Sequence, residues 1–170
     1  MRKRTAVMAL AVLAAGLMVA SLANATGGGK KVFKASLHSH NEVPAISSNG
    51  FGDARLRAGA DGMSFTYELS YGGLNAAAAA AHIHLGQANV NGGVAVFLCG
   101  GGGKPACPAG TGGEESVTGT IVPADIIGPA GQGLAAGEWD ELVRAMRAGV
   151  TYVNVHTSLH PGGEIRDQLK

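Results

Sequence analysis

Alternation of apolar and polar residues in the segment MSFTYELSYGGL constrains the fold of this chain more than any other feature. The odd-numbered residues from Met63 to Tyr71 are apolar, whereas the even-numbered residues between them are Ser, Thr and Glu. Successive side chains of a β-strand point to opposite faces, so this period of two gives one apolar and one polar face. Such a pattern is typical of a half-buried strand in an antiparallel sheet.

Similar short segments recur along most of the chain and are separated by clusters of Gly, Asn, Asp and Pro. They predict further strands at 32–38, 52–58, 93–99, 116–122, 150–156 and 163–169. A different pattern occurs in GEWDELVRAMRAG, where apolar residues recur at i, i+3, i+4 and i+7. We therefore predict an all-β fold, an antiparallel Greek-key-like β-sandwich or barrel, with one short amphipathic helix near residues 137–148 covering one end of the core.

The first 25 residues have the features of a secretory signal peptide. Three basic residues precede a long apolar segment, which ends in small residues at Ala23 and Ala25. An uncleaved anchor is the alternative, because 5–22 is near the lower length limit for crossing a bilayer, but the small residues favour cleavage. We predict a signal peptide at 1–25, a flexible glycine-rich leader at 26–31 and one domain at 32–170, exported to the periplasm or the extracellular space.

Charge and cysteine content restrict the function of the exported chain. Removal of Arg2, Lys3 and Arg4 leaves 10 basic residues against 12 acidic ones, so nothing indicates nucleic-acid binding, and no membrane contact is expected after cleavage. The two cysteines, Cys99 and Cys107, enclose a glycine-rich segment and lack the C-x-x-C spacing of a reactive pair. In an oxidising compartment they predict a structural disulfide.

The six histidines occur in three groups: HSH at 38 and 40, HIH at 82 and 84, and HTSLH at 156 and 160. The alanine run before HIH favours a helix locally, and a helix would point His82 and His84 about 200° apart. The surrounding strand patterns favour a strand instead. On a strand both imidazoles lie on one face, with Cα atoms roughly 6.5 to 7 Å apart, close enough to share a metal ion.

His156 lies in a predicted strand, TYVNVHT, and a neighbouring position would bring it to the same surface as His82 and His84. Copper and zinc both accept imidazole nitrogen, and three histidines leave one coordination position open. We therefore identify His82, His84 and His156 as candidate ligands of copper or zinc, with His38, His40 and His160 as additional candidates. The alternative is that these polar side chains lie on an exposed sheet face without a metal.

Several segments, in order, resemble the CHRD domain, a module named from chordin: ASLHSHNEVP, AAHIHLGQANVNGGVAVFL, VTGTIVPADI and YVNVHTSLHPGGEIRDQ. The resemblance covers nearly all of residues 32–170 and implies an all-β extracellular module with no agreed activity in bacterial members. It includes Glu42, Pro44, His82, His84, Asn154, His156, Gly163, Glu164 and Arg166. His38, His40 and His160 are not family positions, and Asp167 stands where glycine is usual.

A weaker likeness concerns architecture. GLNAAAAAAHIHLG is similar in layout to the strand that carries the His-x-His copper ligands of copper-zinc superoxide dismutases, and VNVHT resembles the segment with their third copper histidine. The chain lacks a recognisable bridging histidine and the zinc-site cluster. The likeness therefore implies at most a mononuclear copper site, and a shared fold does not decide function.

The remaining family positions include three charged residues, Glu42, Glu164 and Arg166. We interpret them as a structural network of carboxylates and guanidinium that ties the first strand to the last. No nucleophile, base and orienting group form a recognisable catalytic set. The sequence thus favours a noncatalytic binding module with a histidine metal site; the alternatives are a metal-free protein- or matrix-interaction domain and, less favoured, a mononuclear copper oxidoreductase.

Overall fold

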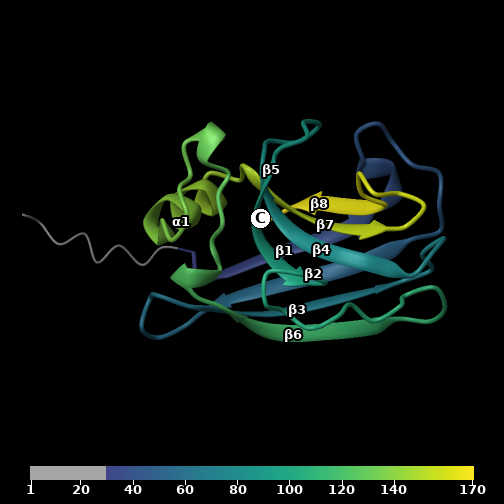
Figure 1. The fold of residues 1–170 in the computed structure, drawn as a ribbon, viewed down its shortest axis with the longest axis horizontal. Helices are drawn as coiled ribbons and strands as arrows, with labels where there is room; N and C mark the ends of the chain where they lie inside the picture. The colour runs from purple at the N-terminus through teal and green to yellow at the C-terminus, as the bar shows by residue number, and fades with distance from the viewer. Residues whose placement is uncertain (1–29) are drawn as a thin grey trace, which may run out of the picture.

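The computed structural model describes residues 30–170, so the predicted signal peptide and most of the predicted leader lie outside the described residues. Within these residues, eight strands and one α-helix form the fold (Figure 1). The strands are β1 (Val32–His38), β2 (Phe51–Ala58), β3 (Phe65–Gly72), β4 (Ala78–Leu85), β5 (Gly93–Cys99), β6 (Glu115–Ile121), β7 (Thr151–Thr157) and β8 (Ile165–Gln168). Short 3₁₀ turns occur at Ser39–Asn41, Pro123–Asp125 and Ala130–Gln132.

All strand pairs are antiparallel, in the order β5-β4-β7-β8-β1-β2-β3-β6. The sheet curls until its ends approach, so that β4, β7 and β8 lie on one side and β2, β3 and β6 on the other (Figure 1). Near the seam, Val96 of β5 forms a bridge with Ile126, and the Tyr67 hydroxyl donates a 2.6 Å hydrogen bond to the carbonyl of Leu98. The predicted all-β antiparallel architecture is confirmed as a nearly closed barrel.

The predicted alternation determines which side chains fill this barrel. In β3, the apolar residues from Phe65 to Tyr71 are buried, and Thr66 and Glu68 between them are exposed. Leu37, Leu69 and Ile83 come from three different strands and have no exposed surface. Each such side chain contributes about 1.5–3 kcal/mol by leaving water.

Helix α1 (Trp139–Arg147) lies at one end of the barrel, as predicted, but is shorter than 137–148. Its buried residues are Trp139, Leu142 and Met146, and the Trp139 ring packs 5.1 Å from that of Phe65. Acidic residues in its first turn and arginines in its last turn favour the helix dipole. No helix in the described part of the chain is long and apolar enough to cross a membrane.

The predicted disulfide between Cys99 and Cys107 is present. It joins the last residue of β5 to the glycine-rich loop that follows this strand. A bridge here restricts a segment that has few apolar side chains of its own, and therefore holds the loop against the end of β5.

Candidate metal centre

Strands β4 and β7 are neighbours, and their register brings the histidines together. His82 lies opposite Asn154, His84 opposite Tyr152, and Ala80 opposite His156. Residues directly opposite in an antiparallel pair share one face of the sheet. The alternate residue Ile83 is fully buried in the barrel core, so the histidines point outward. HIH is thus on a strand, as predicted, although the preceding alanines favour a helix.

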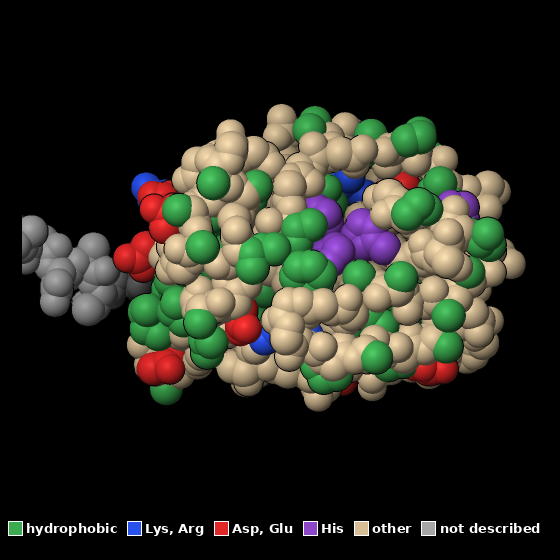
Figure 2. Space-filling model, viewed as in Figure 1, with side chains coloured by type: hydrophobic (Ala, Val, Ile, Leu, Met, Phe, Trp, Pro, Cys, Tyr) green, Lys and Arg blue, Asp and Glu red, His purple; other side chains and the backbone are tan. Residues whose placement is uncertain are grey.

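The ligand atoms of His82, His84 and His156 all lie within 4.8 Å of one another, and no other such group of His, Cys, Asp or Glu is found among residues 30–170. Figure 2 shows the histidines gathered in a hollow on this side of the molecule. The exposed fractions of the three residues are only 8%, 6% and 9%. The alternative that they are ordinary residues on an exposed sheet face therefore does not describe the structure.

Backbone carbonyls fix the orientation of two of the rings. Nδ1 of His84 lies 3.0 Å from the carbonyl oxygen of Gly92, and Nδ1 of His156 lies 3.1 Å from that of Pro161. A carbonyl only accepts, so each Nδ1 carries the proton and each Nε2 of the neutral ring presents a lone pair. A hydrogen bond from the second nitrogen to a carbonyl is the usual outer contact of a metal-bound histidine.

The two free lone pairs face each other, because Nε2 of His84 and Nε2 of His156 are 3.3 Å apart. Two neutral acceptors at this separation gain nothing from each other unless a cation lies between them. With Zn–N bonds of about 2.0–2.1 Å and a tetrahedral angle, two ligand nitrogens are separated by about 3.3–3.4 Å. The observed spacing therefore fits two ligands of one tetrahedral metal ion.

His82 completes the group and is the least satisfied of the three. Both of its ring nitrogens are buried without a hydrogen-bond partner. Its ring centroid lies 4.7 Å from that of His156 and 4.3 Å from that of Phe97, which meets it edge-on. An unpartnered buried polar atom costs about 1–3 kcal/mol, a cost that coordination to a metal would remove.

Burial also keeps the three imidazoles neutral. Burial, together with the smaller effect of the neighbouring His156 and His84, lowers the pKa of His82 to about 3. Burial lowers the pKa of His84 to about 4, against the opposing effect of its bond to Gly92, and it lowers the pKa of His156 as well. Unprotonated imidazole is the form that binds a metal, so the site is ready to coordinate at neutral pH.

The model of the CHRD domain family matches residues 33–169. The chain belongs to the CHRD domain family. No curated protein and no solved structure shows significant similarity to it. The resemblance identified from the sequence motifs is thereby confirmed, and the matched region contains all three histidines of the group.

The additional candidate histidines of this CHRD domain do not join the metal group. His38 is exposed at the end of β1, and His40 is exposed in the 3₁₀ turn that follows. His160 is half-buried, with Nε2 3.4 Å from the side-chain nitrogen of Asn75. Within residues 30–170 the group therefore has three histidines, and the three additional candidates lie on other segments.

Arg166, which we expected to pair with Glu42 or Glu164, is buried but makes different contacts. Its guanidinium donates hydrogen bonds of 3.0 Å to Oδ1 of Asn91 and to the carbonyl oxygen of Val90. The guanidinium carbon lies 3.6 Å from the centroid of the Tyr152 ring. The expected ion pair is absent among the described residues, because the loop after β4 occupies the guanidinium donors.

The two carboxylates instead bind neutral donors. Glu42 accepts a 2.6 Å hydrogen bond from the amide of Asn154, and burial raises its pKa to about 6 although Asn154 and Arg166 oppose this shift. Glu164 accepts from the Thr157 hydroxyl at 2.9 Å and from the backbone N–H of residue 75 at 2.8 Å. Glu42 thus ties the segment after β1 to β7, and Glu164 ties the segment before β8 to β7 and to the segment before β4, through amide and hydroxyl groups.

Sequence reasoning missed the groups that orient the histidines. Tyr152 stacks on His84, with centroids 4.7 Å apart and planes only 6° from parallel. The acceptors at Gly92 and Pro161 are main-chain oxygens, which no side-chain pattern reports. Tyr152 could have been identified from the strand pattern of the sequence, because it lies two residues from Asn154 on the face that also carries His156.

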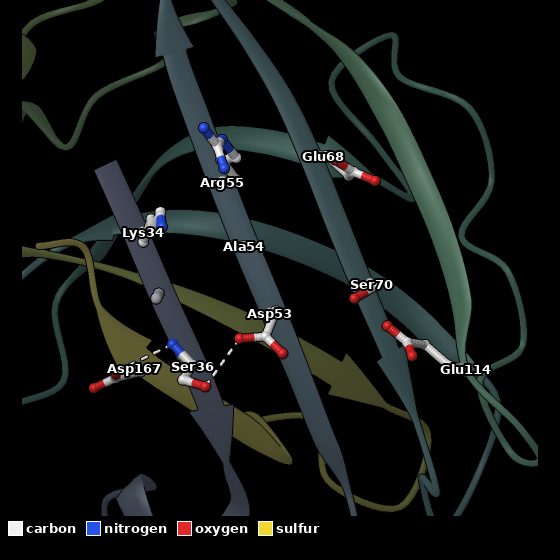
Figure 3. A pocket seen from close by; sticks show the side chains of 10 residues that line it. Lys34, Ser36, Asp53, Ala54, Arg55, Glu68, Ser70, Glu114 and Asp167 are labelled. Atoms are coloured by element: carbon white, nitrogen blue, oxygen red, sulfur yellow. Dashed lines mark hydrogen bonds between the residues drawn. The ribbon is translucent and has the colours of Figure 1, made fainter. Parts of the chain in front are cut away.

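A second hollow of about 570 Å³ lies on the outer face of β1, β2 and β3, which we call the open face. Figure 3 shows the polar and charged residues that line it: Lys34, Ser36, Asp53, Arg55, Glu68, Ser70, Glu114 and Asp167. Ser36 donates from its hydroxyl to Asp53 and from its backbone N–H to Asp167, at 2.9 and 3.2 Å. Asp167 thus satisfies an N–H of β1. No metal-ligating group forms here among the described residues.

Proposed function

We propose that this CHRD domain is a noncatalytic binding module of an exported protein and that it holds one copper or zinc ion through His82, His84 and His156. The observation that carries the proposal is the 3.3 Å approach of two Nε2 atoms whose Nδ1 partners are both occupied by carbonyls. The unpartnered nitrogens of His82 supply the third ligand. Copper and zinc suit imidazole ligands and this spacing.

Export is supported by two features. The disulfide between Cys99 and Cys107 belongs to an oxidising compartment. The sequence of the first 25 residues has a basic start, an apolar middle and small residues at its end, which predicts a cleaved signal. Both features favour a periplasmic or extracellular protein.

The main alternative is a metal-free domain that binds protein or matrix through its loops. Leu159 favours it, because this residue is 64% exposed in the loop between β7 and β8. A copper oxidoreductase is the less favoured alternative. It would need groups that handle substrate at the open coordination position, and the polar neighbours Asn154 and Glu42 already bind each other.

Isothermal titration of the purified, chelator-treated protein with Zn²⁺ or Cu²⁺ tests the proposal. We expect one ion per chain, bound with a Kd below about 10 μM. The His82→Ala variant should lose this binding, because it removes a ligand and leaves the other two rings in place. The His38→Ala variant is the matched control and should bind like the original protein, since His38 lies outside the group.

Absence of binding in the original protein would refute the metal site and favour the interaction domain. Binding that is lost in His38→Ala but kept in His82→Ala would place the ion elsewhere. Circular dichroism of each variant shows whether the sheet is retained.

A further inference from the structure

A positively charged group lies behind one ligand of the proposed metal site. The ring of Tyr152 stacks on His84 at 4.7 Å, and the Arg166 guanidinium carbon lies 3.6 Å from the same Tyr152 ring. His84, Tyr152 and Arg166 come from β4, β7 and β8, which are adjacent in this order. Tyr152 therefore separates the imidazole from the guanidinium, and the two distances place Arg166 at most about 8 Å from the centre of the His84 ring.

The charge of Arg166 has no direct counter-ion in the described part of the chain. Arg166 is only 2% exposed, and its hydrogen bonds go to two neutral oxygens, those of Asn91 and Val90. The nearby Glu42 binds the amide of Asn154 and forms no ion pair with Arg166. Arginine keeps its charge at any physiological pH, so this is a permanent positive charge near the site.

The ligand group itself supplies no negative charge. It consists of three imidazoles, without a carboxylate or thiolate within the group. The whole charge of a bound ion therefore remains uncompensated by its ligands. A divalent ion is repelled by Arg166 twice as strongly as a monovalent one at the same position.

On the basis of the proposed metal site, we propose that it selects monovalent copper, Cu⁺, over divalent ions, and that Arg166, acting across Tyr152, is a selectivity-determining residue. Three imidazole nitrogens suit the low coordination number of Cu⁺, whereas Zn²⁺ requires a fourth ligand, for which no side chain is provided in the group. The aromatic contact of Phe97 with His82 adds an apolar wall, which further disfavours high charge.

Competition with chromophoric ligands tests this selectivity. The affinity of the original protein is measured for Cu⁺, kept reduced without oxygen, and for Zn²⁺ and Cu²⁺. We expect Cu⁺ to bind more tightly than Zn²⁺. In Arg166→Met the Cu²⁺ affinity should rise about tenfold relative to the Cu⁺ affinity, which lowers the Cu²⁺/Cu⁺ potential by about 59 mV.

Two further variants sharpen the test. Arg55→Met removes an arginine from the open face and should leave the ratio of the Cu²⁺ and Cu⁺ affinities unchanged. Glu42→Gln removes a negative charge close to Arg166 and should shift this ratio toward Cu⁺, opposite to Arg166→Met. It also tests the charge effect if Arg166→Met fails to fold.

The possible results separate the two proposals. Tighter binding of Zn²⁺ than of Cu⁺ would overturn the selectivity for Cu⁺ and leave the metal site standing. Affinity ratios that change less than twofold in both Arg166→Met and Glu42→Gln would overturn the role of Arg166. Failure of every ion to bind the original protein would refute both the site and its selectivity.

Discussion

Two outward faces of one curved sheet have opposite characters in this CHRD domain. The outer face of β4, β7 and β8, here the histidine face, is covered by loops and buries His82, His84 and Arg166 almost completely. The open face on β1, β2 and β3 leaves Lys34 and Arg55 exposed. Both faces read as polar in the sequence. Their difference shows that the covering loops, and not the strand pattern, decide whether outward polar residues become solvated or form a site.

The largest difference between the faces should appear in the stability of arginine variants. Arg166→Ala removes charge-assisted hydrogen bonds to Asn91 and Val90 and leaves a space beside Tyr152. We expect a loss of about 2–4 kcal/mol in the free energy of unfolding, measured with urea. The matched variant Arg55→Ala on the open face should change it by less than about 0.5 kcal/mol. Equal effects at both positions would show that the histidine face is not a specially packed region.

Acid should lower the free energy of unfolding of the metal-free protein, because the histidine face buries neutral imidazoles. An unfolded histidine takes up a proton near pH 6.5, whereas burial keeps His82 and His84 neutral down to about pH 3 and 4. The unfolded chain therefore binds more protons below pH 6.5, so stability is full above this pH and declines as pH falls. Glu42, whose pKa is raised to about 6, opposes part of this loss between pH 6 and 4.5.

We expect the free energy of unfolding to fall by about 2 kcal/mol from pH 7 to pH 5. Urea titrations of the metal-free protein at a series of pH values measure this change. The His82→Phe variant should give a shallower decline, because it removes one of the buried rings. A protein that is as stable at pH 5 as at pH 7 would contradict the described burial of the histidines.

A smaller loss of stability is expected from a substitution in the loop between β7 and β8, which supplies the hydrogen-bond acceptor for His156. Gly163 has a φ of +125°, and a Cβ at this position would lie 2.5–2.6 Å from side-chain atoms of Asn154 and Glu42. Gly163→Ala should therefore cost about 1–2 kcal/mol. Its neighbour Gly162 has open space around it, so Gly162→Ala is the control and should be nearly neutral. Thermal unfolding of the two variants distinguishes them, and equal melting temperatures would show that this close packing is unimportant.

The strand pattern made most of the fold predictable, because burial of one face requires apolar residues at alternate positions. It also placed His82 and His84 on one face once the strand was preferred over the helix. The partners of Arg166 were not predictable, since charge complementarity points to Glu42 and Glu164, whereas the loop after β4 presents neutral oxygens closer to the guanidinium. The carbonyls that orient His84 and His156 were not predictable either, because their positions depend on loop conformation.

The most direct test of the account is X-ray absorption spectroscopy of the protein loaded with one equivalent of Zn²⁺. We predict three imidazole nitrogens at about 2.0–2.1 Å, with one further light ligand in the open position, and loss of this imidazole shell in His82→Ala. A zinc shell of oxygen ligands with fewer than two imidazoles would show that the histidine face does not coordinate the ion, and would contradict the proposed function.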